Sequence, residues 1–477
     1  MSKLYTYLLH LMKAKPVKIV ATLGPSTNSE KVIKELAETG VDVFRINFSH
    51  AAPEDVPVIA HWIRNVEKKI DRPLTIMLDL PGPKIRISDM ETNVILEKGK
   101  KFTIEKGVSI GNVHKCGLNQ PDIINILEPG AEVYIDEGTI KLVITAKTEN
   151  SLETTVLIGG ELKPKKGFSA EGMFLANAGI TERDEIGIKL AVEHRLDAMA
   201  ISFVQNEQDV IEVKKRLPEG SKIMLVAKIE TAEGVRNAEA ILGEVDCMMI
   251  ARGDLGLAVP IAQVPYIQKE LIALCVRKTK PVITATQMME SMITKPVPTR
   301  AEVADLANAI LDYTDAVMLS AETATGKYPL ETVSTMVKVI QESKDHLKPF
   351  IFEEKNTMNI ATSSSVGEIA DRVGAKLIIA FTHSGATAKR IARHRHNQSI
   401  LAVSPDAAIM RRLNFTWGVH PIKIEQTRDF EDMLQQAKEL AKNNPVEPLV
   451  EGDYYVISAG MPFGQSGTTN MILVQKV

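Results

Sequence analysis

Cysteine is scarce in this chain of 477 residues, which holds only Cys116, Cys247 and Cys275. None of them stands in a Cys-x-x-Cys pair, and an odd, sparse count argues against a disulfide framework. Cys247 and Cys275 fall in apolar runs, where a cysteine packs as a small hydrophobic residue. We therefore expect a cytoplasmic protein without disulfides.

The chain also lacks long apolar runs and an excess of charge of one sign. No run reaches the roughly 18 residues that a membrane-spanning helix needs. Leu4–Met12 is apolar but short, contains His10 and has no small-residue cleavage site, so we expect a helix over residues 1–15 in preference to a signal peptide. The formal net charge is −3, which indicates neither a nucleic-acid partner nor a membrane partner.

Two common nucleotide-binding fingerprints are missing as well. Thr325-Gly326-Lys327 is similar to the end of a P-loop, but Ala321 stands where Gly-x-x-x-x-Gly-Lys requires its first glycine. No Rossmann glycine fingerprint follows any expected strand. The sequence therefore predicts neither of these phosphate-binding loops.

What the chain does contain is a repeated pairing of a short apolar strand with a helical segment. Hydrophobic residues make up 44% of the chain and charged residues 25%, and its length predicts more than one domain. Eight strand–helix units predict a parallel, closed (β/α)8 TIM barrel over residues 16–83 and 172–349. Its strands are expected at Val17–Thr22, Val41–Phe48, Leu74–Leu80, Asp197–Val204, Lys222–Ile229, Val245–Ala251, Pro281–Thr286 and Asp315–Ser320.

Residues 84–171 interrupt this rhythm with alternating apolar and polar residues and many glycines. Such a pattern predicts an inserted antiparallel β-domain. At the mouth of the barrel it is suited to act as a lid that excludes water; a decorative insertion is the alternative. Its strands are expected at Asn93–Leu96, Lys101–Ile104, Glu132–Ile135, Lys141–Thr145 and Thr154–Ile158.

Residues 350–477 predict a smaller C-terminal α/β domain. Helices are expected at Ser364–Val373 and Ala386–Arg395, and strands at Lys376–Phe381, Ile400–Val403, Tyr454–Ala459 and Met471–Gln475.

Charged residues close two of the buried barrel strands, at the end where such barrels carry their catalytic groups. Lys228 and Glu230 close one strand, and Arg252, Gly253 and Asp254 follow the next. Two neighbouring carboxylates suit Mg²⁺, which also takes substrate and water oxygens. Lys228 shares a strand face with Glu230, where a lysine can neutralise a transferring phosphoryl group. A surface salt bridge, or an ordinary ion pair for Lys228, is the alternative.

A second polar cluster ends the second strand at Arg45–His50. The planar fork of Arg45 favours bidentate contacts with phosphate, and Asn47, Ser49 and His50 add polar groups nearby. A purely structural histidine is equally consistent with His50. Polar residues at the other strand ends are Asp79, Ser202, Thr286, Ser320 and Glu322.

Seven segments together resemble the pyruvate kinase family over nearly the full length of the chain. They are Arg45–His50, Leu78–Arg86 (LDLPGPKIR), Ala227–Val235 (AKIETAEGV), Met249–Leu257 (MIARGDLGL), Thr284–Met292 (TATQMMESM), Pro298–Ala309 (PTRAEVADLANA) and Met318–Pro329 (MLSAETATGKYP). The resemblance implies phosphoryl transfer from phosphoenolpyruvate to ADP, which gives ATP and pyruvate. It also implies Mg²⁺ or Mn²⁺ as cofactor and a homotetramer.

Carried over by motif, the resemblance gives individual residues expected roles. Glu230 and Asp254 correspond to Mg²⁺ ligands, and Lys228 to the transition-state stabiliser. Ser320 and Glu322 resemble the end of a polar chain that delivers a proton to the enolate, without naming one donor. The phosphoenolpyruvate side corresponds to Arg45, Lys228, Arg252, Gly253, Asp254 and Thr286. The nucleotide side corresponds to Asn47, Phe48, Ser49, His50, Arg86 and Arg183, the last at a position that is often lysine.

One departure from the family pattern predicts activity without K⁺. Many members have glutamate at the position of Lys84, and in those members K⁺ lies on oxygens at the positions of Asn47, Ser49, Asp79 and Leu80. The Lys84 ammonium would place a fixed positive charge where that ion lies. The alternative is that Lys84 points to solvent and K⁺ still binds.

The segment Thr382-His383-Ser384-Gly385-Ala386-Thr387 precedes an expected helix in the C-terminal domain. Hydroxyl groups and free N–H groups at a helix start can hold an anion, and the segment resembles the family's effector-phosphate loop. A phosphorylated activator is therefore expected, of a kind that the sequence does not identify. Arg390, Arg393 and Arg395 follow, and a solvated helix face is the alternative for them.

Two other functions remain open at this stage. Another barrel enzyme that handles phosphoenolpyruvate or an enolate with Mg²⁺, such as an aldolase-type lyase, would not need the inserted domain or Arg86. A catalytically silent metabolite sensor would use only its C-terminal domain.

Overall fold

The structure is a computed structural model that describes residues 15–92, 94–170, 173, 179–350, 352, 357–444, 446, 448–461 and 469–477. The helix predicted over residues 1–15 lies outside these ranges, apart from Lys15. Within them, no helix has the length and hydropathy needed to cross a membrane.

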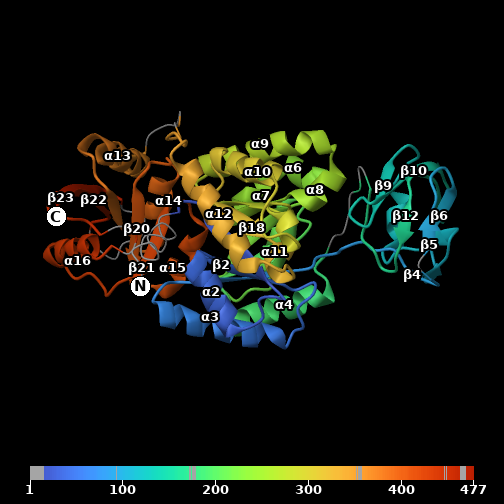
Figure 1. The fold of residues 1–477 in the computed structure, drawn as a ribbon, viewed down its shortest axis with the longest axis horizontal. Helices are drawn as coiled ribbons and strands as arrows, with labels where there is room; N and C mark the ends of the chain where they lie inside the picture. The colour runs from blue at the N-terminus through green and yellow to red at the C-terminus, as the bar shows by residue number, and fades with distance from the viewer. Residues whose placement is uncertain are drawn as a thin grey trace.

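Eight parallel strands close into a barrel in the middle of the molecule (Figure 1). The last strand pairs with the first, and each strand overlaps the one expected from the sequence, which confirms the predicted TIM barrel. The strands are β1 (Lys18–Leu23), β2 (Val43–Asn47), β3 (Thr75–Asp79), β14 (Ala198–Ile201), β15 (Met224–Ile229), β16 (Cys247–Ala251), β17 (Val282–Ala285) and β18 (Ala316–Leu319).

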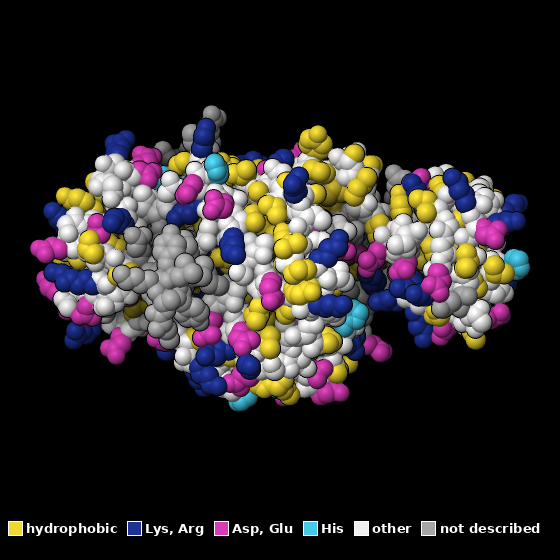
Figure 2. Space-filling model, viewed as in Figure 1, with side chains coloured by type: hydrophobic (Ala, Val, Ile, Leu, Met, Phe, Trp, Pro, Cys, Tyr) yellow, Lys and Arg dark blue, Asp and Glu magenta, His cyan; other side chains and the backbone are white. Residues whose placement is uncertain are grey.

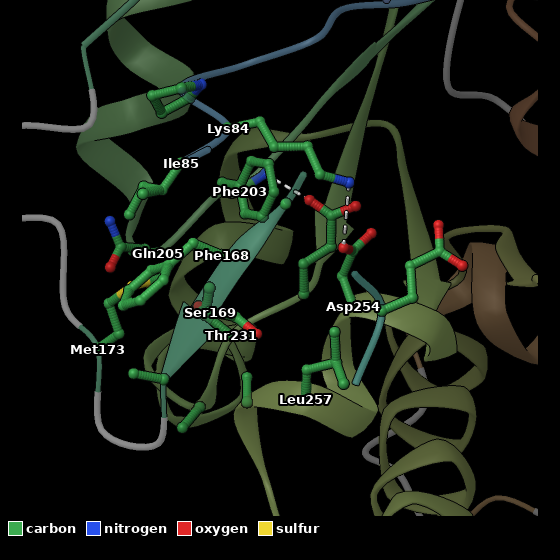
Figure 3. Close-up of a pocket in the computed structure, with 17 residues that line it drawn as sticks. Lys84, Ile85, Phe168, Ser169, Met173, Phe203, Gln205, Thr231, Asp254 and Leu257 are labelled. Atoms are coloured by element: carbon green, nitrogen blue, oxygen red, sulfur yellow. Dashed lines mark hydrogen bonds and ion pairs between the residues drawn. The ribbon is translucent and has the colours of Figure 1, made fainter. Parts of the chain in front are cut away.

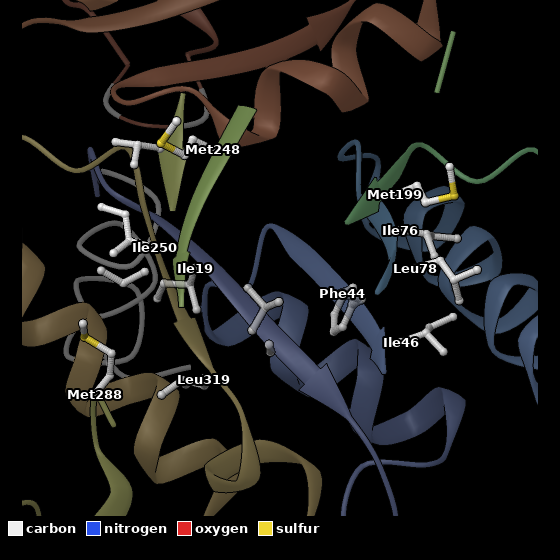
Figure 4. Close-up of a cluster of buried hydrophobic side chains, with 14 of the residues drawn as sticks. Ile19, Phe44, Ile46, Ile76, Leu78, Met199, Met248, Ile250, Met288 and Leu319 are labelled. Carbon is white, nitrogen blue, oxygen red and sulfur yellow. The ribbon is translucent and has the colours of Figure 1, made fainter. Parts of the chain in front are cut away.

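The barrel strands are buried on both faces, because side chains fill the interior and helices cover the outside. Val20 and Val43 belong to the cluster that fills the barrel. Ile19 and Phe44, their neighbours in sequence, belong to the layer beneath the helices (Figure 4). Phe415, from the C-terminal part of the chain, joins the inner cluster and closes the amino end of the barrel.

Helices surround the barrel, and several begin at side chains that cap free N–H groups. Thr181, Asn206 and Thr299 each form a capping box with an acidic residue three positions later, which fixes where the helix starts. The α-helices are α2 (Glu30–Thr39), α3 (Asp55–Ile70), α4 (Glu182–Glu193), α5 (Glu207–Lys214), α6 (Ala232–Arg236), α7 (Ala238–Glu244), α8 (Arg252–Ala258), α9 (Val264–Arg277), α10 (Arg300–Leu311), α11 (Ala321–Ala324) and α12 (Pro329–Lys344). Short 3-10 helices are η2 (Ile261–Gln263) and η3 (Glu290–Ile293).

A six-stranded sheet follows β3 and extends to one side of the barrel (Figure 1). Its order is β13-β9-β10-β11-β6-β8, and only the β6–β8 pair is parallel. The strands expected here are present, but the sequence missed the shortest ones, which hold too few residues to show alternation. The elements are β4 (Asp89–Met90), β5 (Val94–Leu96), β6 (Lys101–Glu105), β7 (Ile110–Gly111), β8 (Lys115–Cys116), η1 (Pro121–Asn125), β9 (Glu132–Ile135), β10 (Ile140–Lys147), β11 (Ser151–Ile158), β12 (Gly160–Leu162) and β13 (Phe168–Ala170).

The C-terminal part forms a separate five-stranded α/β unit on the opposite side of the barrel (Figure 1). Its strand order is β21-β20-β19-β22-β23, with helices packed on both faces. The sequence missed β21, α15 and α16. The elements are α13 (Met358–Val373), β19 (Leu377–Phe381), α14 (Ala386–Ala392), β20 (Ser399–Ser404), α15 (Ala407–Arg412), η4 (Leu413–Phe415), β21 (Val419–Lys423), α16 (Phe430–Lys442), β22 (Tyr454–Ala459) and β23 (Met471–Lys476).

Candidate active site

Charged side chains from three strands form an ion-pair network at the carboxyl end of the barrel. Arg45, on β2, places Nε and Nη2 each 2.7 Å from Asp79 Oδ2 at the end of β3. Lys228, on β15, has its Nζ 3.2 Å from Asp79 Oδ1 and 3.0 Å from Glu230 Oε1. One buried carboxylate, Asp79, therefore holds the guanidinium and the ammonium in the same polar region.

The network fixes the protonation of its members. Burial raises the pKa of the Asp79 carboxyl, but Lys228 and Arg45 outweigh it and hold that pKa below its ordinary value. Burial lowers the pKa of Lys228, but Asp79 and Glu230 outweigh it and raise the pKa well above the ordinary value. Lys228 therefore stays a cation and cannot act as a base near neutral pH.

Two hydroxyl groups extend the network, and sequence reasoning gave neither of them a role. Arg45 Nη1 donates to Thr22 Oγ1 at 2.9 Å. Lys228 Nζ donates to Ser202 Oγ at 2.7 Å, and Ser202 in turn donates to the Leu80 carbonyl oxygen at 2.7 Å. The sequence identifies Ser202 only as a polar residue at the end of a strand. Both residues end barrel strands, so strand-end position is the signal that could have found them.

Glu230 and Asp254 line one cavity and are the carboxylates best placed for a divalent cation. Glu230 is buried and accepts a hydrogen bond from the Phe203 N–H at 2.7 Å (Figure 3). Burial raises the pKa of Glu230, and the repulsion from Asp254 adds to this effect, against the attraction of Lys228. Two mutually repelling carboxylates match the one or two that Mg²⁺ uses alongside substrate oxygens and waters. Within the described ranges, no group of three potential metal ligands gathers anywhere.

Lys84 approaches this carboxylate pair from the other side of the cavity. Its Nζ lies 3.7 Å from Asp254 Oδ1 (Figure 3), and each of the two side chains is 37% exposed. Among the contacts of the described residues, the ion pair of Lys84 is with Asp254 and not with Asp79. Among the described residues, no hydrogen bond or ion pair joins the Lys84 ammonium to Asn47, Ser49, Asp79 or Leu80, and its role in place of K⁺ stays a prediction.

Arg252 turns outward from the mouth of the barrel. Its guanidinium is 2.8 Å from Asp305 Oδ2 on α10 and donates to the Thr286 carbonyl oxygen at 2.7 Å. The neighbouring Gly253 N–H donates to Thr286 Oγ1 at 2.9 Å, and Thr286 has a positive φ of 69°. In this structure Arg252 braces the loop that carries Thr286, and its contact with substrate stays a prediction.

The residues expected on the nucleotide side lie beside β2 and α4. Arg183 donates from Nε to the Phe48 carbonyl oxygen at 2.8 Å and lies over the Phe48 ring. Asn47 Oδ1 accepts from the Ser49 N–H at 3.1 Å. The pKa of the exposed His50 is lowered by partial burial and then by cations that include Arg86. Neutral His50 thus lies among positive charges suited to phosphates.

Ser320 and Glu322 lie where β18 passes into α11. Glu322 is buried, and its carboxylate accepts from the Ser320 N–H at 2.7 Å and from the Met289 N–H at 3.2 Å. Burial raises the pKa of Glu322, against these backbone hydrogen bonds. Glu322 therefore ties two strand-end loops together beneath the cleft.

The expected effector loop is far from this cleft, between β19 and α14. Gly385 has a φ of 84°, and its N–H donates to Thr382 Oγ1 at 2.9 Å. His383 and Ser384 are exposed, whereas the buried Thr387 hydroxyl contacts Thr469 Oγ1 at 2.7 Å. Two of the six residues thus face solvent.

A closed parallel barrel with a cationic and carboxylate cluster at its carboxyl end defines the chain as a barrel enzyme of phosphate chemistry. The family model described as pyruvate kinase, barrel domain, matches residues 14–333, and the model described as pyruvate kinase, alpha/beta domain, matches residues 360–475. This chain belongs to the pyruvate kinase family, whose members are phosphotransferases.

Similar proteins match this chain over nearly its whole length. The pyruvate kinase of Methylorubrum extorquens is 38% identical over 97% of this chain and 98% of its own. The pyruvate kinase of Geobacillus stearothermophilus is 39% identical over 98% of this chain and 81% of its own. That of Clostridium acetobutylicum is 36% identical over 96% of this chain and 99% of its own.

Proposed function

We propose that this chain transfers the phosphoryl group of phosphoenolpyruvate to ADP in the presence of Mg²⁺ or Mn²⁺ and releases ATP and pyruvate. The single observation that carries the proposal is the Arg45–Asp79–Lys228–Glu230 network at the carboxyl end of the barrel. Such a network is oriented before substrate binds, so its cations meet developing charge without reorganisation. The full-length similarity to pyruvate kinases supports the same reaction.

The cations and the carboxylates of the site have different roles. Arg45 and Lys228 neutralise the phosphoryl oxygens, and Lys228 also faces the enolate oxygen that is released. Glu230 and Asp254 are the residues that would hold the divalent cation, which supplies charge neutralisation on the phosphoryl and carboxylate oxygens when bound. Gly253 and Thr286 offer an N–H and a hydroxyl to the carboxylate of the substrate.

The nucleotide and the proton are handled by separate parts of the cleft. Asn47, Ser49, His50, Arg86 and Arg183 lie where a nucleoside diphosphate can approach the phosphoryl group in line. The inserted sheet carries part of the cavity wall and serves as the lid that excludes water. Ser320 and Glu322 belong to the loops beneath the cleft, where a polar chain returns a proton to the enolate carbon.

The decisive experiment is ATP formation from phosphoenolpyruvate and ADP, followed by a coupled assay with and without Mg²⁺. Wild type should turn over only with the divalent cation. An aldolase-type lyase would consume substrate without making ATP, and a metabolite sensor would bind without turnover. Either result overturns the proposal.

We further propose that the enzyme works without K⁺, because Lys84 supplies a fixed cation at the cleft. Its ion pair with Asp254 and the commitment of Asp79 to Arg45 and Lys228 support this. Activity in tetraalkylammonium buffer free of Na⁺ should equal activity with K⁺. Lys84→Glu should then require K⁺, with Lys84→Gln as the uncharged control. A large activation of wild type by K⁺ would contradict the idea.

A phosphorylated metabolite is proposed to activate the enzyme at Thr382–Thr387. The exposed Ser384 and His383 support an accessible loop. Thr387→Glu places a carboxylate in that loop and should abolish activation while basal turnover persists. A panel of phosphorylated metabolites, tested on both proteins, identifies the activator, and activation that survives the substitution counts against the loop.

A homotetramer and a cytoplasmic location complete the proposed function. Apolar side chains gather over the upper side of the barrel in Figure 2, near α8 and α9 in Figure 1. Ile261 and Tyr266, in η2 and α9, are 72% and 69% exposed and suit contact with a second copy. All three cysteines are free and buried, as in a reducing compartment. Light scattering after size exclusion would measure the assembly.

A further inference from the structure

Between α14 and the amino end of the barrel lies a small cavity of about 10 Å³, room for roughly one water-sized sphere. In Figure 1, α14 and α15 are helices of the C-terminal unit that lie next to the barrel. The cavity walls come from both units and are rich in cations. The polar residues that line it are Thr279, Lys280, Asp315, Lys389, Arg393, Arg395 and Thr416.

One carboxylate, Asp315, faces these cations, and its oxygens are already engaged. Asp315 Oδ2 lies 3.0 Å from Arg395 Nη2 and accepts from the Val282 N–H at 3.2 Å. Asp315 Oδ1 accepts from the Trp417 N–H at 3.0 Å. Asp315 therefore balances Arg395, and among the described residues that line the cavity it is the one carboxylate.

Lys389 is the next cation that lines the cavity. Its side chain is partly exposed, and burial, with repulsion from Arg412, lowers its pKa against the attraction of Asp246 and Asp315. Within the described residues the Lys389 ammonium has no hydrogen bond and no ion pair. A cation that is partly withdrawn from water without a contacting anion is incompletely compensated.

Two further donors around the cavity also lack an acceptor among the described residues. The Oγ1 of Thr416 and the Nε of Arg395 are buried without a hydrogen-bond partner, and these side chains belong to residues that are 3% and 2% exposed. Lys280, by contrast, is satisfied by the Val245 carbonyl oxygen at 2.7 Å and by two others at the end of α7. The groups without an acceptor are therefore all hydrogen-bond donors: the Lys389 ammonium, the Arg395 Nε and the Thr416 hydroxyl. The first two belong to positively charged side chains.

We propose that this cavity binds one small inorganic anion of halide size, held by the Lys389 ammonium, the Arg395 guanidinium and the Thr416 hydroxyl. A monatomic anion accepts hydrogen bonds from all three donors and offsets the charge of Lys389, which a water molecule cannot do. A phosphate exceeds the room that the cavity offers. The three groups that hold the anion all belong to the C-terminal unit, and the anion lies at the boundary with the barrel, where Asp315 and Lys280 line the same cavity.

The direct test is a crystal of the full-length protein soaked in sodium bromide, with diffraction data collected at the bromine absorption edge. The expected result is an anomalous peak between Lys389 Nζ and Thr416 Oγ1 in wild type and none in Lys389→Met. A cavity that holds only water, or nothing, in wild-type crystals overturns the proposal.

A second measurement does not depend on crystals. The apparent unfolding midpoint of the full-length protein is compared in 200 mM sodium chloride and in 200 mM sodium gluconate, whose anion is too large for the cavity. Chloride should raise the midpoint of wild type by roughly 1–3 °C, and Lys389→Met and Thr416→Val should lose most of this rise.

Lys438→Met is the matched control, because it removes one exposed lysine from the same unit. It should keep the full chloride effect. In gluconate, Lys389→Met should be at least as stable as wild type, since it removes a cation that has no ion pair within the described residues. An equal response to chloride in wild type and in both cavity variants rejects the site.

Discussion

The two ends of the barrel both carry buried charges, but they differ in what satisfies those charges. At the carboxyl end, Arg45 and Lys228 both pair with Asp79, and Lys228 also pairs with Glu230, which lines a cavity. At the amino end, Lys18 donates to the Val419 carbonyl oxygen and Asp315 pairs with Arg395, both in the C-terminal unit. The charges at the carboxyl end lie where a ligand can reach them. The charges at the amino end join the barrel to the C-terminal unit.

Packing follows the same division. The amino end is closed by Phe415, while Asn414 donates to the Pro73 carbonyl oxygen at 2.8 Å and Thr75 donates to that of Arg411 at 2.6 Å. The carboxyl end receives strand-end loops and the inserted sheet, with a cavity between them. At the carboxyl end the charged groups therefore pair among themselves beside a cavity, whereas at the amino end the C-terminal unit supplies their partners.

The largest expected effect separates two lysines on barrel strands. Lys228→Met at the carboxyl end should lower kcat by about 10³-fold or more, because it removes the cation that meets the transferring phosphoryl group. Lys18→Met at the amino end should leave kcat within about twofold. Steady-state kinetics with both substrates at saturation measure each value. Similar kcat values for the two variants would remove the functional distinction between the ends.

The next effect is on stability and falls at the amino end. Asp315→Asn leaves Arg395 buried without its carboxylate, which should cost about 3–5 kcal/mol of unfolding free energy. Urea unfolding followed by tryptophan fluorescence suits the test, since the backbone N–H of Trp417 donates to Asp315. Glu239→Gln, at an exposed ion pair with Lys278, is the control and should leave the urea midpoint unchanged. Equal urea midpoints for the two variants would show that the Asp315–Arg395 ion pair does not stabilise the protein.

The smallest effect concerns pH. Burial lowers the pKa of Lys18 to about 7 from 10.5, against the attraction of Asp42. Between these two values the unfolded chain binds the extra proton, so this group makes stability rise with pH. From pH 7 to pH 9.5, wild type should therefore gain roughly 1–3 kcal/mol relative to Lys18→Met. Urea midpoints at both pH values measure the difference, and parallel changes in the two proteins would contradict it.

The sequence predicted the barrel well because its strands are short apolar runs, each long enough to be seen alone. It missed β21, where His420 and Pro421 interrupt the apolar pattern, and the two-residue strands of the inserted sheet. These elements form because partners far along the chain complete them, and no local pattern records such a partner. The sequence predicted the C-terminal unit as α/β but did not predict all of its helices and strands.

The candidate site shows the same limit at the level of side chains. Strand-end positions found Arg45, Lys228, Glu230 and Asp254, because a charge that follows a buried strand must reach solvent or a partner. The outward turn of Arg252 toward Asp305 depends on the position of α10, which lies 53 residues away. Sequence spacing predicts which residues reach the mouth of the barrel, but not the direction in which each side chain turns there.

The position of Phe415 affects any attempt to produce the barrel as a separate fragment. The innermost layer of the barrel includes a ring that lies more than 90 residues beyond the last barrel strand, in η4 of the C-terminal unit. A fragment that stops after α12 would have an unfilled interior at its amino end and an apolar opening toward water. The barrel is therefore not an autonomous module, and its final assembly must wait until the C-terminal unit has been synthesised.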